Sequence, residues 1–418
     1  MKTRRRQYVS EDLLTVSRRR QNVLEDLQTV SPRNKRSSTL ANKGENSAES
    51  IPIDLIIEIL LKLPVASIAS CRCVSKLWDS MIRLPHFTDS ISARSKLLFA
   101  CKRYGNMCFF SSSQPKIPDE NSSPIAADYQ LSFKFCGDAR KLSRPVHGLI
   151  ILKYYKKGTK ERVMEICNPS TGQSLTLPKV KTVRIDVYSF FGYDPVDKKF
   201  KVLSMTKLRS GRNRRTTEHH QVLTLGGTGK LSWRMIDCSL PHYPLCDGIC
   251  INGVLYYKAE VDRFHSSYGI VCFDIRSEKF EFIEKQLLPS KLLNYMGKLA
   301  ILKWDDDFKM VRSNSLELCV LEDAKKHEWS TRTFVLPALW NDVVADVTLD
   351  IVGVTRGGEI VFSRLHSSDL LFLIYYNPER STLTKVDIQG MDAFQHCIVH
   401  TFLDHVENVK LGGVFGTT

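Results

Sequence analysis

The sequence predicts an α+β multidomain protein, in which a short all-α unit of three helices precedes a larger all-β domain. Three observations support this prediction. An apolar stretch with helical periodicity, interrupted by prolines, lies between residues 51 and 81. From about residue 96, short β-branched and aromatic runs separated by turn residues replace that periodicity. The first 50 residues are polar and basic and show neither pattern.

Length and composition set the broad class of the protein. The chain has 418 residues, of which 43% are hydrophobic, which is enough for a sizeable core and for two domains. It contains no run of about 18 uncharged apolar residues, so we expect no membrane span. The N-terminus lacks the apolar segment of a secretory signal, and the 12 cysteines include no Cys-x-x-Cys pair. We therefore expect reduced thiols and a location in the nucleus and/or the cytoplasm.

The N-terminal segment is strongly basic. Residues 1–50 hold eleven Lys and Arg against six Asp and Glu, so they carry +5 of the net charge of +15. They contain a 14-residue tandem repeat, in which Arg4–Ser17 and Arg18–Ser31 match at 11 positions. Two such units cannot bury a core, so we predict a disordered tail over residues 1–50. Its arginine clusters fit either a nuclear import signal or a solvated leader without a targeting role.

The first predicted helix is apolar over almost its whole circumference. Between Ile53 and Leu63 the polar residues are Asp54, Glu58 and Lys62, which are spaced by four and form one thin stripe. Prolines near both ends suit a first helical turn and a helix stop. Burying three or four such side chains is worth about 1.5–3 kcal/mol each. A unit of three short helices cannot bury the whole apolar surface of this first helix. We therefore expect the helix to bind a partner or to dock on the rest of the chain.

Two more helices are predicted, one near Val65–Arg72 and one from about Val74. In the last of these, Val74, Leu77, Trp78 and Met81 recur at i, i+3, i+4 and i+7. An alternative interpretation is that the three helices form an ordinary buried bundle and present no surface for a partner.

The stretch "IPIDLIIEILLKLPVASIASCRCVSKLWDSMI" closely resembles the F-box, in both its "P-x-D-L-x-x-E-I-L-x-x-L-P" half and its "C-V-S-K-x-W" half. We therefore assign residues 51–95 to an F-box. The resemblance implies that this surface packs on the small Skp-type adaptor of a cullin–RING ubiquitin ligase. The positions that it carries over to adaptor binding are Pro52, Leu55, Ile56, Ile59, Leu60, Leu63, Pro64, Val65, Val74, Lys76 and Trp78.

The β domain repeats a theme of strand, Asn or Asp, polar turn and second strand. Examples are "CNPSTGQSLTLP", "YDPVDKKFKVL", "FDIRSEKFEFIE", "LEDAKKHEWSTRTF" and "YNPERSTLTKVDI". Asn and Asp initiate turns through their own side chains. Gly-led strands recur between these units, which are spaced by about fifty residues in the later part. We predict a kelch-like β-propeller of about six blades over residues 96–405, followed by a tail over 406–418, with a twisted β-sandwich as the alternative.

The motifs of this domain also resemble the plant F-box-associated domain. "GLIIL", "ICNPSTGQSLTLP", "FFGYDPVDKKFKVL", "VLYYKA" and "VCFDIRSEKFEFI" fall in that family's order, within a resemblance that spans Pro145–Ile388. The family implies a receptor role toward a protein substrate and does not specify the substrate.

Several segments invite a catalytic, phosphate-binding or metal-binding interpretation. Gly226–Lys230 ("GGTGK") lacks the leading Gly and the final Ser/Thr of a phosphate-binding loop, so we predict a hairpin turn. No nucleophile–base motif is present, and we predict a non-catalytic protein. The run Trp304–Asp307 reads as an exposed loop, although Ca²⁺ favours such acidic runs.

Two groups of His and Cys have irregular spacing. Cys238, His242, Cys246 and Cys250 are each four residues apart, but prolines and a glycine in that segment argue against a helix that would align them. We therefore predict no metal and no cofactor. A second group, with members at His396, Cys397, His400 and His405, is more simply a closing strand of the propeller.

The best candidate for substrate binding is a basic insertion at Lys207–His220, because propeller loops usually form the binding surface. Arg pairs bidentately with carboxylate or phosphate, so this loop suits an acidic or phosphorylated target. The alternative is a solvated run of charge. Its basic residues are Lys207, Arg209, Arg212, Arg214 and Arg215.

The two resemblances together imply a substrate-recognition subunit of an SCF-type cullin–RING E3 ubiquitin ligase. Its partners would be a Skp-type adaptor, through it the cullin and RING subunits, and a protein substrate. Two alternatives remain open: a protein-interaction module without ligase function, and a basic nucleic-acid-binding regulator, for which no recognition motif is present.

Overall fold

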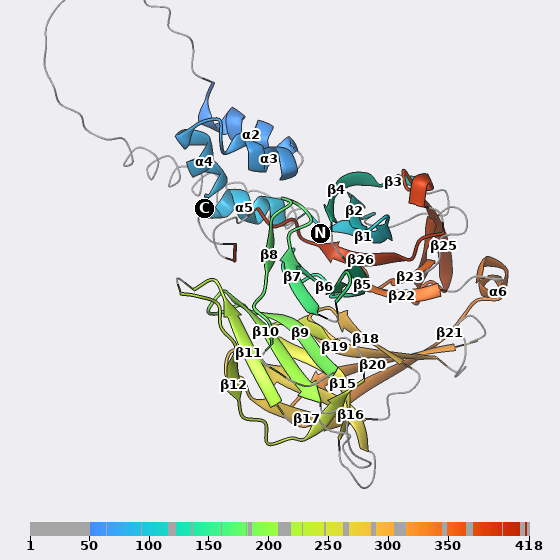
Figure 1. Ribbon diagram of the computed structural model, residues 1–418. Coiled ribbons are helices and arrows are strands. Elements are labelled where there is room, and N and C mark those ends of the chain that lie inside the picture. Colours follow the sequence, from blue (N-terminus) through green and yellow to red (C-terminus); the bar gives the residue numbers. More distant parts are fainter. Residues whose placement is uncertain are drawn as a thin grey trace, which may run out of the picture. The chain divides into compact units, whose positions relative to one another are not determined.

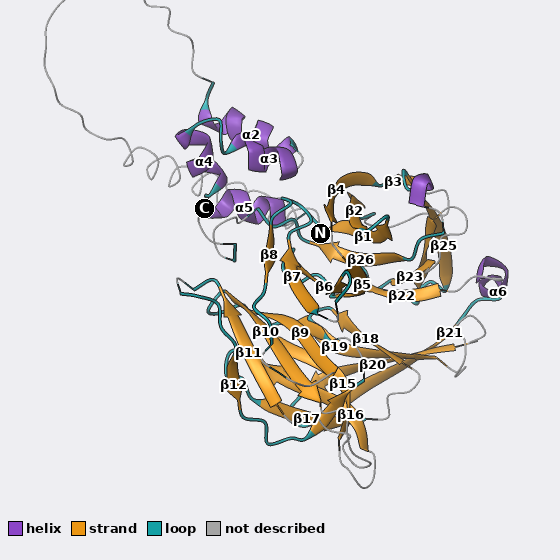
Figure 2. Cartoon of the chain, in the orientation of Figure 1, coloured by secondary structure: helices purple, strands orange, loops and turns teal. Residues whose placement is uncertain are grey.

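A computed structural model gives the structure of the chain. It describes residues 51–409 and 414–415, except for 64, 93, 116–122, 135–136, 160, 181, 183–185, 208–218, 228, 246–247, 262–266, 286–289, 305–314, 345–348, 365–370 and 395. The predicted tail and its tandem repeat lie outside the described residues. Helices occur at the N-terminal end of the described chain, and strands make up nearly all the rest (Figures 1 and 2). Among the described helices, none is long and apolar enough to cross a membrane.

Four short helices form the helical unit, α2 to α5. Their bounds are α2 Ile53–Lys62, α3 Val65–Cys71, α4 Lys76–Ile82 and α5 Pro85–Ser92. The first three match the predicted helices, and α4 begins two residues later than expected because Ser75 caps it. The Ser75 hydroxyl accepts a hydrogen bond from the Trp78 backbone N–H at 3.1 Å, which satisfies one of the open donors of a helix start. The additional helix α5 has Pro85 at its first position, where proline lacks no bond that the helix needs.

The strands of the chain form six sheets among the described residues. We call these sheets blades and number them along the chain. The first three have the orders β26-β1-β2-β4, β5-β6-β7-β8 and β9-β10-β11-β12. Blade 1 consists of β26 Val399–His405, β1 Lys96–Arg103, β2 Asn106–Ser113 and β4 Asp128–Lys134. Blade 2 consists of β5 Gly137–Leu142, β6 Ile150–Lys156, β7 Arg162–Cys167 and β8 Ser174–Thr176. Blade 3 consists of β9 Asp186–Asp194, β10 Lys199–Lys207, β11 His219–Leu225 and β12 Arg234–Ile236.

The other three blades follow the same antiparallel plan. In blade 4, both β13 His242–Pro244 and β14 Ile249–Ile251 pair with β15 Val254–Val261, which is followed by β16 Ser267–Asp274 and β17 Phe280–Glu284. Blade 5 consists of β18 Ser290–Tyr295, β19 Lys298–Trp304, β20 Ser315–Asp323 and β21 Glu328–Val335. A short helix, α6 Leu339–Val344, leads to blade 6. Blade 6 consists of β22 Leu349–Val354, β23 Ile360–Arg364, β24 Leu371–Asn377, β25 Thr382–Gln389 and β3 Ile125–Ala126.

Six hydrophobic clusters lie between successive blades and close them into a ring. Five clusters join blades 1 and 2, 2 and 3, 3 and 4, 4 and 5, and 5 and 6. The sixth joins blade 6 back to blade 1. A two-layer sandwich would not give this cyclic set of interfaces. The prediction of a six-bladed propeller is therefore confirmed, and the β-sandwich alternative is wrong.

Both faces of an inner strand are buried, which explains why such strands read as continuous apolar runs in the sequence. In β24, Leu371, Leu373 and Tyr375 pack in the cluster shared with blade 1. The intervening residues, Phe372, Ile374 and Tyr376, pack in the cluster shared with blade 5. Because successive side chains of a strand point to opposite faces, a blade with a neighbour on each side needs apolar residues at both positions.

The predicted Asn/Asp turns are present at all five positions. The Asp194 carboxylate accepts hydrogen bonds from the backbone N–H groups of Val196 at 2.9 Å and Asp197 at 3.2 Å. The same side-chain turn occurs at Asn168, Asp274, Asp323 and Asn377. Each turn reverses the chain between two paired strands of one blade.

The two ends of the β domain meet in blade 1. The closing strand β26 pairs antiparallel with β1, as Figure 1 shows, and the register places Phe402 opposite Leu98. Beyond β26, the Glu407 carboxylate forms an ion pair with the Lys96 ammonium at 2.9 Å. The predicted closing strand around His400 and His405 is thus confirmed. A second closure lies in blade 6, where β3 pairs in parallel with β25.

Gly148 supports the closure from the side of blade 2. Its φ is +81°, and a Cβ atom at this position would lie 2.5 Å from the Val406 carbonyl oxygen. Next to it, the Asn408 side chain donates a hydrogen bond to the His147 carbonyl at 2.9 Å. The C-terminal segment therefore lies against a backbone that only glycine allows it to approach.

We predict that Gly148→Ala destabilises the propeller more than Gly158→Ala does. Both glycines have positive φ, but a Cβ at Gly158 meets nothing within 4 Å. Gly158→Ala should thus cost only the backbone strain, about 1–2 kcal/mol. Gly148→Ala should cost about 1–3 kcal/mol more, because the C-terminal segment must move. Urea unfolding of the two variants measures the difference, and equal losses would contradict the assigned role of this contact.

Candidate functional site

The helical unit has a small hydrophobic core, which also includes Val409 of the C-terminal segment. Its fully buried side chains are Leu60, Val65, Ile68, Met81, Ile82, Phe87 and Ile91, and Ile56 is 8% exposed. These residues come from all four helices, so each helix contributes one apolar side to a common centre. The core is too small to take in the rest of the apolar surface.

Five large apolar side chains of this segment remain exposed, and we call them the exposed apolar set. They are Ile51 (57% exposed), Leu55 (50%), Ile59 (50%), Val74 (65%) and Leu77 (45%). Leu55 and Ile59 are four residues apart and share one face of α2, and Ile51 lies four residues before them. Val74 and Leu77 flank the start of α4. So many exposed apolar side chains in about thirty residues are typical of an interaction surface.

An ion-pair network fixes α4 relative to the preceding turn. Asp79 lies 2.5 Å from the Arg72 guanidinium and 2.8 Å from that of Arg83. Burial alone would raise the pKa of Asp79, but hydrogen bonds from Arg83 and Arg72 outweigh it and hold that pKa below its ordinary value. The carboxylate thus stays charged and orients the segment that carries Val74 and Leu77.

The eleven predicted adaptor-binding positions differ in their burial. Pro52, Leu55, Ile59, Val74 and Lys76 are exposed, and Leu63 and Trp78 are half-buried. Pro64 lies outside the described residues. The side chains of Ile56, Leu60 and Val65 pack in the helical core, and their part in adaptor binding stays a prediction. Ile51 and Leu77 are also exposed and were not among the predicted positions.

The propeller contains a central cavity of about 610 Å³. Its lining includes residues of all six blades, so it lies on the axis of the ring. One residue from each blade is His400, Lys153, Phe190, Ile249, Lys291 and Asp350.

Lysines and an arginine at this cavity connect the blades. The Lys291 ammonium lies 2.5 Å from the Asp350 carboxylate of the next blade. Burial lowers the pKa of Lys291, and the negative charge of Asp350 partly opposes this effect. The Lys153 ammonium donates to the Ser189 carbonyl at 2.5 Å, and Arg144 donates to the Leu292 carbonyl at 3.2 Å. These polar contacts therefore connect strands of different blades around the cavity.

Other predicted segments are only partly described. Lys207 ends β10, whereas Arg209, Arg212, Arg214 and Arg215 lie outside the described residues, as does the acidic part of Trp304–Asp307. Gly226–Lys230 connects β11 with β12, which pair antiparallel, in agreement with the predicted hairpin.

Comparison with known proteins agrees with the two-part architecture. The model of the F-box domain matches residues 49–90. The model of the F-box associated beta propeller domain matches residues 96–406. The chain belongs to the F-box proteins with an F-box-associated β-propeller. Proteins of this family are generally non-catalytic, and an F-box implies binding to a Skp-type adaptor.

Close relatives of this F-box protein occur in plants. F-box protein DOR of Arabidopsis thaliana is 48% identical over 382 residues, which cover 89% of this chain and 96% of the relative. F-box protein At5g65850 of the same plant is 49% identical over 422 residues, which cover 98% and 99%. Among solved structures, TolB from Acinetobacter baumannii covers 74% of this chain and 66% of its own, with 9% identity and a TM-score of 0.42.

We predict that substitutions at two adjacent residues of α2 differ strongly in their effect on stability. Leu60→Ala should destabilise the helical unit by about 2–5 kcal/mol, because Leu60 is fully buried. Ile59→Ala should change its stability by no more than about 0.5 kcal/mol, because Ile59 is half-exposed. Hydrogen exchange of the α2 to α5 amides in the full chain measures both effects. Similar protection in the two variants would contradict the difference in burial between Leu60 and Ile59.

Proposed function

We propose that this F-box protein is a substrate-recognition subunit of an SCF-type cullin–RING ubiquitin ligase. The observation that carries the proposal is the exposed apolar set on a helical unit whose sequence matches the F-box. Burying these side chains against an adaptor would contribute about 1.5–3 kcal/mol for each one covered completely. A helix face with apolar anchors four residues apart suits a hydrophobic groove in the partner.

The proposed mechanism is proximity. The helical unit binds the Skp-type adaptor, which in turn holds the cullin and RING subunits, and the propeller binds a protein target. Two binding surfaces on one chain raise the local concentration of the target near the ubiquitin-loaded enzyme. The F-box protein itself transfers no group.

For the target surface, the basic insertion that follows β10 remains our proposal. Arginines bind carboxylates and phosphates bidentately, so an acidic or phosphorylated segment of the target would suit this loop. Its position between two strands of a blade is typical of propeller binding loops.

We predict that Leu55→Asp/Ile59→Asp weakens binding of a purified Skp-type adaptor by about 100-fold or more, because two charges replace two apolar anchors. The matched control is Asp54→Ala/Glu58→Ala on the polar stripe of the same helix, which should bind like wild type. Isothermal calorimetry measures the affinities, and circular dichroism verifies folding. Equal binding by both variants would contradict the proposed surface, and failure of the folded wild type to bind would favour an interaction module without ligase function.

We predict that replacing Lys207, Arg209, Arg212, Arg214 and Arg215 with Ala reduces target ubiquitination and leaves adaptor binding intact. Quantitative proteomics of ubiquitinated peptides in plant cells that express either form measures the effect. Unchanged ubiquitination with both forms would contradict a role for the loop. Salt-sensitive binding of RNA or DNA by the wild type, lost in the variant, would instead favour a nucleic-acid regulator.

A further inference from the structure

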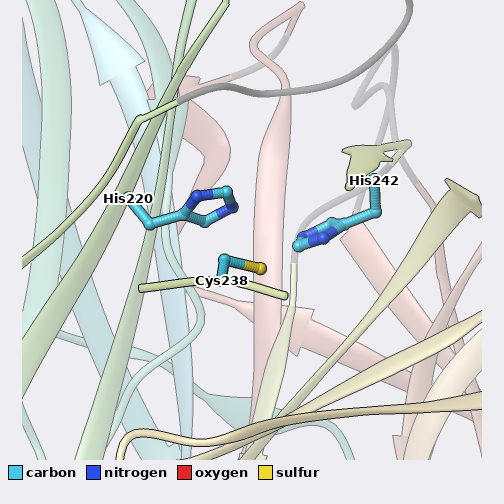
Figure 3. A group of neighbouring side chains, drawn as sticks. All are labelled: His220, Cys238 and His242. Atoms are coloured by element: carbon cyan, nitrogen blue, oxygen red, sulfur yellow. The ribbon is translucent and has the colours of Figure 1, made fainter. Parts of the chain in front are cut away.

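Three potential metal ligands meet between blades 3 and 4. They are His220 on β11, Cys238 in the connection after β12, and His242 on β13. Figure 3 shows the three side chains turned toward one another, and their ligand atoms all lie within 4.8 Å of each other. Of the four residues that are spaced by four in the sequence, from Cys238 to Cys250, only Cys238 and His242 belong to this group. His220, from the strand β11, is its third member. Of the other two residues with that spacing, Cys250 lies outside this group, and Cys246 lies outside the described residues.

The cluster is removed from water. His220 is 4% exposed and His242 is fully buried, while Cys238 is half-buried. Binding of a cation would release the proton of the Cys238 thiol, because the thiolate is the form that binds a metal.

The orientation of His242 is fixed in the way that metal-binding histidines require. Its Nδ1 lies 2.7 Å from the Leu240 carbonyl oxygen, which can only accept, so Nδ1 carries the proton. The lone pair is therefore on Nε2, which lies 2.7 Å from the Tyr257 hydroxyl. A backbone carbonyl on one ring nitrogen commonly orients the other toward a metal. The Tyr257 hydroxyl can turn from Nε2 toward the Met205 sulfur, which is 3.7 Å away.

The donor set determines the class of cation. One thiolate and two imidazoles suit a borderline-soft metal ion, whereas Mg²⁺ and Ca²⁺ require oxygen ligands. Tetrahedral zinc places its ligand atoms about 3.3–3.8 Å apart, given its usual bond lengths to nitrogen and sulfur. Side-chain rotations that move the ligand atoms by roughly 1 Å would bring the three atoms to these separations.

We propose that His220, Cys238 and His242 form a structural Zn²⁺ site that links blade 3 to blade 4. The fourth ligand would be water or the Tyr257 hydroxyl. The strand β13, to which the connection from β12 leads, pairs with β15 over three residues. A cation bound here would fasten that connection to both neighbouring sheets.

The main alternative is a hydrogen-bonded cluster that needs no metal. The Cys238 thiol donates to the Leu240 carbonyl oxygen at 3.1 Å, the same oxygen that accepts from His242. Both states satisfy the buried polar atoms, so direct metal measurements must distinguish them.

The test uses the full chain, stripped with a chelator and titrated with Co²⁺ as a spectroscopic substitute for Zn²⁺. We expect one equivalent to produce a thiolate-to-cobalt charge-transfer band and the visible bands of a tetrahedral site, and Zn²⁺ to abolish both by displacement. Cys238→Ser should lose the charge-transfer band, whereas Cys250→Ser should retain it. His220→Gln should weaken Zn²⁺ binding at least about 100-fold, whereas His219→Gln, which alters the adjacent residue on the opposite face of β11, should bind normally.

Thermal unfolding gives a second readout, because a ligand that binds only the folded state raises the melting temperature. Excess Zn²⁺ should raise it for wild type and for His219→Gln, and should leave it unchanged for Cys238→Ser. Failure of the folded wild type to bind Zn²⁺ would overturn the proposal. Equal binding by Cys238→Ser and wild type would also overturn it, since the metal would then lie elsewhere on the chain.

Discussion

Burial of both faces of every blade is the constraint on which this structure depends. A sheet at the end of an open stack would leave one apolar face in water, and the clusters between blades show that no blade is in that position. Closure therefore requires the first and last strands of the domain to pair within blade 1. Two lysine side chains also join neighbouring blades. The Lys201 ammonium donates to the Ile275 carbonyl at 2.6 Å, and Lys291 pairs with Asp350, so each joins one blade to the next.

The helical unit, in contrast to the propeller, does not bury all of its apolar surface. Its core takes one side of each short helix and leaves Leu55 and Ile59 in water, although α2 is apolar nearly all round. A closed propeller offers six satisfied interfaces, whereas this unit leaves one apolar surface without cover among the described residues. The proposed function follows from that difference. The propeller buries its apolar surface within itself, whereas in our proposal the helical unit buries its remaining apolar surface against a partner.

The parts of the structure that local chemistry determines could be predicted from the sequence. The carboxylate of Asp194 forms its turn with residues two and three positions later, so the pattern is readable without knowledge of the fold. The apolar runs and their spacing also sufficed to predict a ring of about six blades. The features that depend on tertiary contacts could not be predicted from the sequence. Leu60 and Ile59 are equally apolar neighbours, and only the packing of α3 to α5 decides which of them is buried. His220 joins Cys238 and His242 across two blades, a proximity that no spacing in the sequence expresses.

We propose that the exposed apolar surface of the helical unit is the docking site for a Skp-type adaptor. Calorimetric titration of the full chain with purified adaptor at several temperatures is the decisive experiment, because burial of apolar surface gives a negative heat-capacity change of binding. We expect a one-to-one complex with a clearly negative heat-capacity change. Absence of binding by the folded chain, or binding without that change, would contradict it.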